Sequence, residues 1–73
     1  MNATTKHSVV VEGHKTSISL EPEFWQAFTT ICRQQGKTVT GKIQEIDAAR
    51  TTNLSSAIRL FVLDHFQSLA DPR

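Results

Sequence analysis

The stretch Lys15-Thr16-Ser17-Ile18-Ser19-Leu20-Glu21-Pro22 decides the fold of this chain. Side chains alternate along it, so that Thr16, Ile18 and Leu20 fall on one face, and the lysine and the two serines fall on the other. A period of two residues predicts a β-strand with one buried face. Pro22 has no amide hydrogen for a ladder, and its fixed φ suits the first position of a helix. We therefore expect a strand over residues 15–21 that passes directly into a helix.

The first two helices follow from apolar spacing and from capping residues. Phe24, Phe28 and Ile31 recur at helical intervals, and Gly36 suits a C-terminal cap, which places the first helix at about residues 22–35. Thr38 is a suitable N-cap for a second helix, whose apolar face consists of Val39, Ile43 and Ile46.

A third helix is predicted over about residues 54–69, with Thr52 or Asn53 as its cap. Its apolar residues cover much more than the ~100° stripe of an ordinary surface helix. They are Leu54, Ala57, Ile58, Leu60, Phe61, Val62, Leu63, Phe66 and Leu69. Such a helix must be buried on most sides, either at the centre of a monomeric bundle or against a second chain. We favour the second chain, because one thin monomer cannot cover it.

The predicted strand needs a partner, because a lone strand leaves backbone groups unpaired along both edges. It can pair with the β-prone run Val9–Val11 in a hairpin around Gly13. It can also pair with the same strand of a second chain, and the two pairings are compatible. Pairing between chains accounts for the strand and the third helix together. We therefore expect an intertwined homodimer with intersubunit antiparallel strands.

Chain length also favours self-association. The 73 residues form one small domain, and a single core of that size rarely supplies more than ~3–5 kcal/mol. Cys32 is the only cysteine, so no disulfide forms within the chain, and we expect it to be structural. Cys32 and the three histidines lack paired-ligand spacing, so neither a metal nor a cofactor is expected.

The termini are polar and flank one predicted domain. We expect a disordered tail over residues 1–7, the domain over residues 8–69 and a short tail over residues 70–73. No stretch approaches the ~20 apolar residues that span a bilayer, and residues 1–7 lack the apolar core of a signal peptide. With a single cysteine, this pattern is typical of a cytoplasmic protein.

Charge and motifs favour binding over catalysis. The formal charge is only +1, but its excess lies in residues 1–20, where Lys6 and Lys15 outnumber Glu12. A dimer that pairs two such segments concentrates positive charge on one face. The chain shows no serine–histidine–carboxylate constellation and no glycine-rich phosphate loop, so no enzyme is expected.

Three segments resemble the ribbon-helix-helix (Arc/MetJ-like) superfamily, and more closely its short bacterial domain proteins. They are Gly13-His14-Lys15-Thr16-Ser17-Ile18-Ser19-Leu20-Glu21-Pro22-Glu23-Phe24-Trp25, Glu45-Ile46-Asp47-Ala48-Ala49-Arg50 and Asn53-Leu54-Ser55-Ser56-Ala57-Ile58-Arg59. The resemblance covers about residues 8–68. It implies a mainly α fold with a short β-ribbon and an extra helix, an extra piece around the second helix that matches Glu45–Arg50, and a homodimer that can associate into tetramers. It further implies a transcriptional regulator that binds double-stranded DNA as a repressor.

The resemblance also assigns residues to DNA. Outward residues of the ribbon read base edges in the major groove, and the N-terminus of the second helix clamps a phosphate. In this chain the readers correspond to Lys15, Ser17 and Ser19, and the clamp to Lys37, Thr38, Val39, Thr40 and Lys42. Two short serines make no bidentate base contacts, so readout is expected to draw on water and DNA shape.

The dimer interface is expected to combine the inner strand face with apolar residues of the first and third helices. Its predicted residues are Thr16, Ile18, Leu20, Phe24, Phe28, Leu54, Ile58, Phe61 and Val62. Along the second helix, Asp47 and Glu45 lie within reach of Arg50 or Lys42. An ion pair between Asp47 and Arg59 is also compatible with the sequence, since a charge beside an apolar core needs a partner.

A second function is compatible with the same fold. A dimeric module can bind a protein, for instance by strand addition at the Val9–Val11 edge, as an adaptor or antitoxin-like protein would. DNA binding through several phosphates falls steeply with salt, whereas a hydrophobic protein interface does not. Salt dependence therefore separates the two functions.

Overall fold

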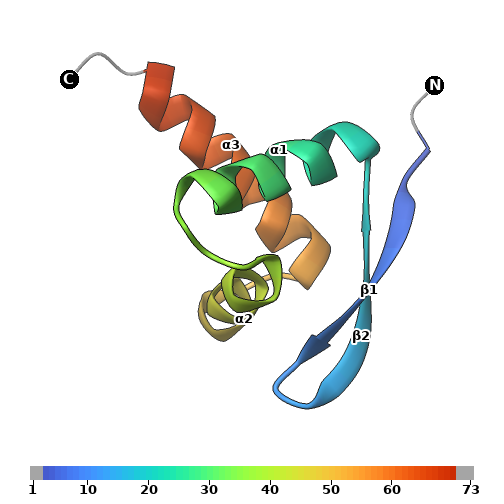
Figure 1. Ribbon diagram of the computed structural model, residues 1–73. Coiled ribbons are helices and arrows are strands. Elements are labelled where there is room, and N and C mark those ends of the chain that lie inside the picture. Colours follow the sequence, from blue (N-terminus) through green and yellow to red (C-terminus); the bar gives the residue numbers. More distant parts are fainter. Residues whose placement is uncertain (1–2, 71–73) are drawn as a thin grey trace.

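The computed structural model describes residues 3–70 and contains a two-stranded ribbon followed by three helices (Figure 1). The elements are β1 (Thr5–Val11), β2 (His14–Leu20), α1 (Pro22–Gln34), α2 (Val39–Ala49) and α3 (Leu54–Ala70). The expected order of strand and helices is confirmed, including the extra helix. The homodimer stays a prediction, because a single chain does not test it.

The two strands form an antiparallel hairpin that runs from the Val11–His14 pair at the turn to the Thr5–Leu20 pair at the open end. The turn consists of Glu12 and Gly13, whose φ angles are 50° and 80°. Positive φ at both positions is the signature of a type I′ turn, which matches the twist of the flanking strands. Of the two pairings that the sequence allowed, the hairpin is therefore present within the chain.

The N-terminal tail is shorter than predicted. Residues 5–7 belong to β1 and pair with residues 18–20, whereas the sequence placed all of residues 1–7 in a disordered tail. In the strand, the side chains of Thr5, His7 and Val9 lie on one face and those of Lys6 and Ser8 lie on the other. Residues 1–2 and 71–73, the ends of the two expected tails, lie outside the described residues.

Capping residues set the helix ends. Gly36 adopts a φ of 69°, which stops α1 close to the predicted end. The Thr38 hydroxyl accepts a hydrogen bond from the Gly41 amide at 3.0 Å, and a Cβ at residue 41 would approach that oxygen to 2.9 Å. Glycine in the first turn of α2 therefore preserves its cap. Asn53, one of the two residues predicted for the purpose, caps α3 by accepting from the Ser56 amide.

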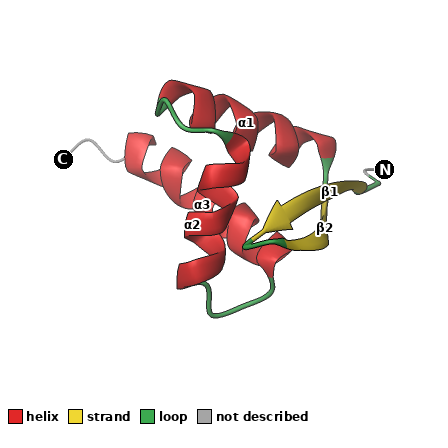
Figure 2. Ribbon diagram, turned by 60° about the horizontal axis from the view of Figure 1, so that its bottom comes forward, coloured by secondary structure: helices red, strands yellow, loops and turns green. Residues whose placement is uncertain are grey.

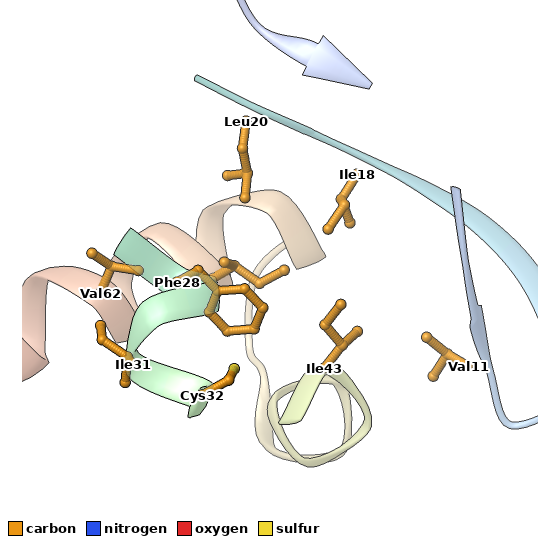
Figure 3. Packing of buried hydrophobic residues seen from close by; sticks show 9 residues of the cluster. Val11, Ile18, Leu20, Phe28, Ile31, Cys32, Ile43 and Val62 are labelled. Carbon is orange, nitrogen blue, oxygen red and sulfur yellow. The ribbon is translucent and has the colours of Figure 1, made fainter. Parts of the chain in front are cut away.

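The core lies between the inner face of the hairpin and the three helices (Figure 3). Phe28 is fully buried at its centre, 5.8 Å from the Phe61 ring in a T-shaped arrangement and 6.1 Å from the Trp25 ring. The buried residues are Val11, Ile18, Leu20, Phe28, Ile31, Cys32, Ile43, Ile58 and Val62. Every element of the described chain therefore contributes to one core.

This core bears on the predicted dimer interface, which stays a prediction because a single chain does not test it. Five of the residues expected there bury themselves within one chain and retain almost no surface for a partner. They are Ile18, Leu20, Phe28, Ile58 and Val62. The other four, Thr16, Phe24, Leu54 and Phe61, are partly buried. The inner strand face was assigned to the dimer because the sequence does not show that helices of the same chain cover it.

Helix α3 remains poorly covered. Its later turns extend past the rest of the molecule, away from the hairpin (Figure 1). Leu60, Leu63, Phe66 and Leu69 are 50–70% exposed. In Figure 2 the last turns of α3 likewise reach beyond α2. A helix with this much exposed apolar surface is not the covered centre of a monomeric bundle.

None of the helices in the described part of the chain is long and apolar enough to cross a membrane.

Candidate nucleic-acid interface

The outer face of the hairpin carries a row of polar and cationic side chains. Strand register places Lys6 opposite Ser19, Ser8 opposite Ser17 and Val10 opposite Lys15. Directly opposed residues share a face, so these six side chains all point away from the core. Lys15 and Ser17 are exposed, while Ser19 is partly buried. The face thus contains two lysines and no carboxylate.

A hollow joins this face to the start of α2. It has a volume of about 270 Å³ and is lined by Ser8, Val9, Val10, Lys15 and Thr40. The structure therefore brings together Lys15, a predicted base reader, and Thr40, a predicted phosphate ligand. An ammonium group and two hydroxyl groups around one hollow are donors that suit an anionic oxygen.

Two other predicted phosphate ligands are engaged elsewhere. Lys37 donates to Glu45 at 2.8 Å, and Lys42 donates to the same carboxylate at 3.4 Å. The Lys42 side chain is only 13% exposed and its ammonium group lies 4.8 Å from the centre of the Phe61 ring. These lysines, Lys37 foremost, hold the pKa of Glu45 below its usual range. In this conformation both lysines contact Glu45.

Backbone groups on the outer edge of β2 differ in whether they already have a hydrogen-bond partner. In a two-residue hairpin the residues flanking the turn form a hydrogen-bonded pair, and such pairs alternate along the ladder. The amide and carbonyl groups of Lys15, Ser17 and Ser19 therefore point away from β1. At Ser19 both are occupied, since its amide donates to the Ser55 hydroxyl at 3.0 Å and its carbonyl accepts from Arg59 at 3.2 Å.

Arg59 connects α3 to the junction between β2 and α1. Besides the Ser19 carbonyl, its guanidinium binds both oxygens of Glu21, at 3.0 and 3.4 Å. The predicted Asp47–Arg59 pair is wrong, because Asp47 instead accepts from Arg50 at 2.7 Å. Arg50 is only three positions from Asp47 along the chain. Glu21 lies next to Arg59 of α3 because β2 ends beside that helix. The contacts of Arg59 with Glu21 and the Ser19 carbonyl therefore fix the end of β2.

The Arg59–Glu21 pair predicts a pH dependence of stability. Arg59 holds the pKa of Glu21 below its ordinary value of 4.5. The folded state therefore favours the carboxylate, and this stabilisation is complete above the ordinary pKa and is lost as pH falls through the depressed one. We expect Glu21→Gln to be less stable than the parent chain at pH 7, with the difference closing below about pH 4.5.

Urea unfolding followed by circular dichroism from pH 7 to pH 3 checks this expectation. Glu23→Gln, at an exposed carboxylate outside these ion pairs, serves as the matched control. A Glu21→Gln difference that stays constant across this range would contradict the role assigned to the pair.

His7 anchors β1 to α1. Its ring stacks on that of Trp25, with centroids 3.8 Å apart and an angle of 12° between the planes. Since His7 lies between Lys6 and Ser8, this contact holds their strand in place. Lys6 and Ser8 were not among the predicted DNA contacts, because residues 1–7 were expected to form a tail and the β-prone run began at Val9.

Other chemistry is not evident in the described part of the chain. Residues 3–70 contain no group of three histidine, cysteine or acidic side chains that could hold a metal ion. Cys32 is 1% exposed, and burial raises the pKa of its thiol, which favours the neutral form. It acts as a small apolar residue of the core.

Comparison with known proteins agrees with this arrangement. A protein-family model described as a ribbon-helix-helix domain matches residues 4–66. No curated protein and no solved structure gives a significant match.

Proposed function

Because the chain belongs to the ribbon-helix-helix family, whose domains are typically DNA-binding and regulatory, we propose that it is a dimeric transcriptional repressor. The ribbon of the dimer lies in the DNA major groove with the outer face of each hairpin toward the bases. The observation that carries this proposal is the outward row of two lysines and three serines, with no carboxylate among them.

The outer face suits the chemistry of base edges. A β-ribbon fits the major groove, where Lys15 can donate to guanine and the hydroxyl groups of Ser17 and Ser19 can donate or accept. Contacts of this kind carry modest specificity, so water bridges and DNA shape contribute to the choice of operator.

Phosphate contacts set the register on DNA. The free amides at the start of α2, at Val39 and Thr40, together with the hollow beside Lys15, provide an anion site at one side of the ribbon. Lys37 and Lys42 join this site only if Glu45 releases them, since it holds both.

Dimerisation fits the surfaces that one chain leaves open. Family members usually form dimers, and two features support the same state here. The edge of β2 offers unpaired backbone groups at Lys15 and Ser17, and α3 exposes Leu60, Leu63 and Phe66. A second chain would cover both.

Fluorescence anisotropy with labelled duplexes tests the proposal. The chain is titrated against its own upstream region and against pooled random duplexes, at about 50 and about 200 mM salt. We expect affinity to fall on the order of 10³-fold or more between these concentrations, as for a protein with several phosphate contacts. The triple variant Lys15→Ala/Ser17→Ala/Ser19→Ala should lose binding.

Arg33→Ala, a charge removed from the exposed end of α1, is the matched control and should bind like the parent chain. A folded protein that binds neither duplex at the lower salt would end the repressor proposal. A search for a protein partner at the exposed face of α3 would then follow.

A further inference from the structure

We propose that β1 is a phosphate-binding flange, in which Lys6 and Ser8 contact the sugar-phosphate backbone at the rim of the major groove while β2 reads the bases. This inference rests on the proposed function and adds a division of labour between the strands. Neither residue belongs to the DNA contacts that the family resemblance assigned, because the expected reading strand was β2 alone.

Register gives the first step. Lys6 and Ser8 stand directly opposite Ser19 and Ser17 across the hairpin, on the face that points away from the core. When that face approaches DNA, the two residues of β1 approach with it. The first strand therefore widens the binding face and does not cover it.

Strand spacing gives the second step. Adjacent strands lie about 4.8 Å apart, and the major groove is about 12 Å wide. If two β2 strands pair at the dimer axis, each lies about 2.4 Å from it and each β1 lies about 7 Å from it. The walls of the groove are about 6 Å from the same axis. The β2 pair thus fits inside the groove, and β1 is placed over the phosphates that border it.

The chemistry of β1 gives the third step. Both side chains are exposed, and in residues 3–70 the Lys6 ammonium takes part in no salt bridge, in contrast to Lys37 and Lys42. A flexible ammonium group and a hydroxyl group bind phosphate oxygens without base preference. His7 lies between these two residues in sequence, and its stack on Trp25 fixes the strand. Less conformational entropy is therefore lost when the strand binds DNA.

The experiment compares Lys6→Gln with Lys15→Gln, and both with Arg33→Gln as a charge-matched control on α1. Anisotropy titrations over about 50 to 200 mM salt give the slope of log affinity against log salt for the upstream duplex and for a shuffled duplex of equal composition. For Lys6→Gln we expect a slope shallower by about 1.8 per dimer, which is about 0.9 for each phosphate that the variant no longer neutralises. Its affinity should fall by the same factor on both duplexes.

Lys15→Gln should instead change the ratio of the two affinities, and Lys6→Arg should keep the parent slope. A Lys6→Gln slope equal to that of the parent chain, with the parent bound and the variant folded by circular dichroism, overturns the flange and leaves the proposed function intact. A loss confined to the upstream duplex also overturns it, because that result would make Lys6 a base reader. Absence of binding by the parent chain overturns the proposed function itself.

Discussion

Phe28→Ala is expected to leave most of the protein unfolded at 25 °C. Phe28 is fully buried and its ring packs against those of Trp25 and Phe61, so no other side chain can fill the space that it leaves. Phenylalanine-to-alanine changes in such positions cost about 3–5 kcal/mol. A single core in a chain of this length rarely supplies more than about 3–5 kcal/mol, so the loss is as large as the whole stability.

Far-ultraviolet circular dichroism with urea titration measures the effect, at two protein concentrations about a hundred-fold apart. Leu60→Ala removes a comparable side chain that is 57% exposed, and it should change the monomer's own stability by less than about 1 kcal/mol. The stability of the Phe28→Leu variant should lie between those of Phe28→Ala and Leu60→Ala. A Phe28→Ala chain that keeps a cooperative transition near that of the parent would show that the core is arranged differently.

The helices were predictable from local chemistry. Pro22, Gly36 and Thr38 act within a turn of the chain, through a missing amide, a positive φ and a side-chain cap, so their effect can be deduced without knowing what packs nearby. The same holds for the face that Ile18 and Leu20 share, which follows from the pleat of a strand.

The extent of β1 and the partner of Arg59 were not predictable in the same way. A run of three valines hid the alternation that starts at Thr5, because apolar residues on both faces blur a period of two. The partner of Arg59 is Glu21, 38 positions away, and only the turn from β2 into α1 brings them together. Spacing along the second helix pointed correctly to Arg50 as a partner for Asp47, whereas no local spacing points from Arg59 to Glu21.

Only part of the candidate site could be predicted, because some of its side chains depend on tertiary contacts. Lys15, Ser17 and Ser19 share a face whatever their surroundings, whereas the use of Lys37 and Lys42 depends on Glu45, which binds both. Lys6 and Ser8 enter the site only through the hairpin register. Side chains that depend on tertiary pairing are thus the ones on which sequence reasoning failed.

Ser17→Pro is expected to disrupt the proposed dimer while leaving the hairpin intact. The Ser17 amide points to the outer edge of β2, so proline at this position removes no hydrogen bond to β1. If two β2 strands pair at the dimer axis, the change removes at least one ladder hydrogen bond from each chain and places a ring at the contact. At about 1 kcal/mol for each bond, plus the carbonyl left unpaired, the dissociation constant of the dimer should rise on the order of 100-fold.

Ser8→Pro provides the matched control, because Ser8 faces Ser17 in the hairpin and its amide points to the opposite, outer edge of β1. The two variants impose the same restriction on φ and differ only in the edge that they block. Sedimentation velocity over about 1 to 100 μM should therefore show a weakened dimer for Ser17→Pro and a parent-like dimer for Ser8→Pro. The reverse result would place the interface on β1, where Lys6 and Ser8 would be drawn toward the axis and away from the phosphates. Equal sedimentation of both variants and the parent chain would remove the strands from the interface and leave the exposed face of α3 as the surface that joins the two chains.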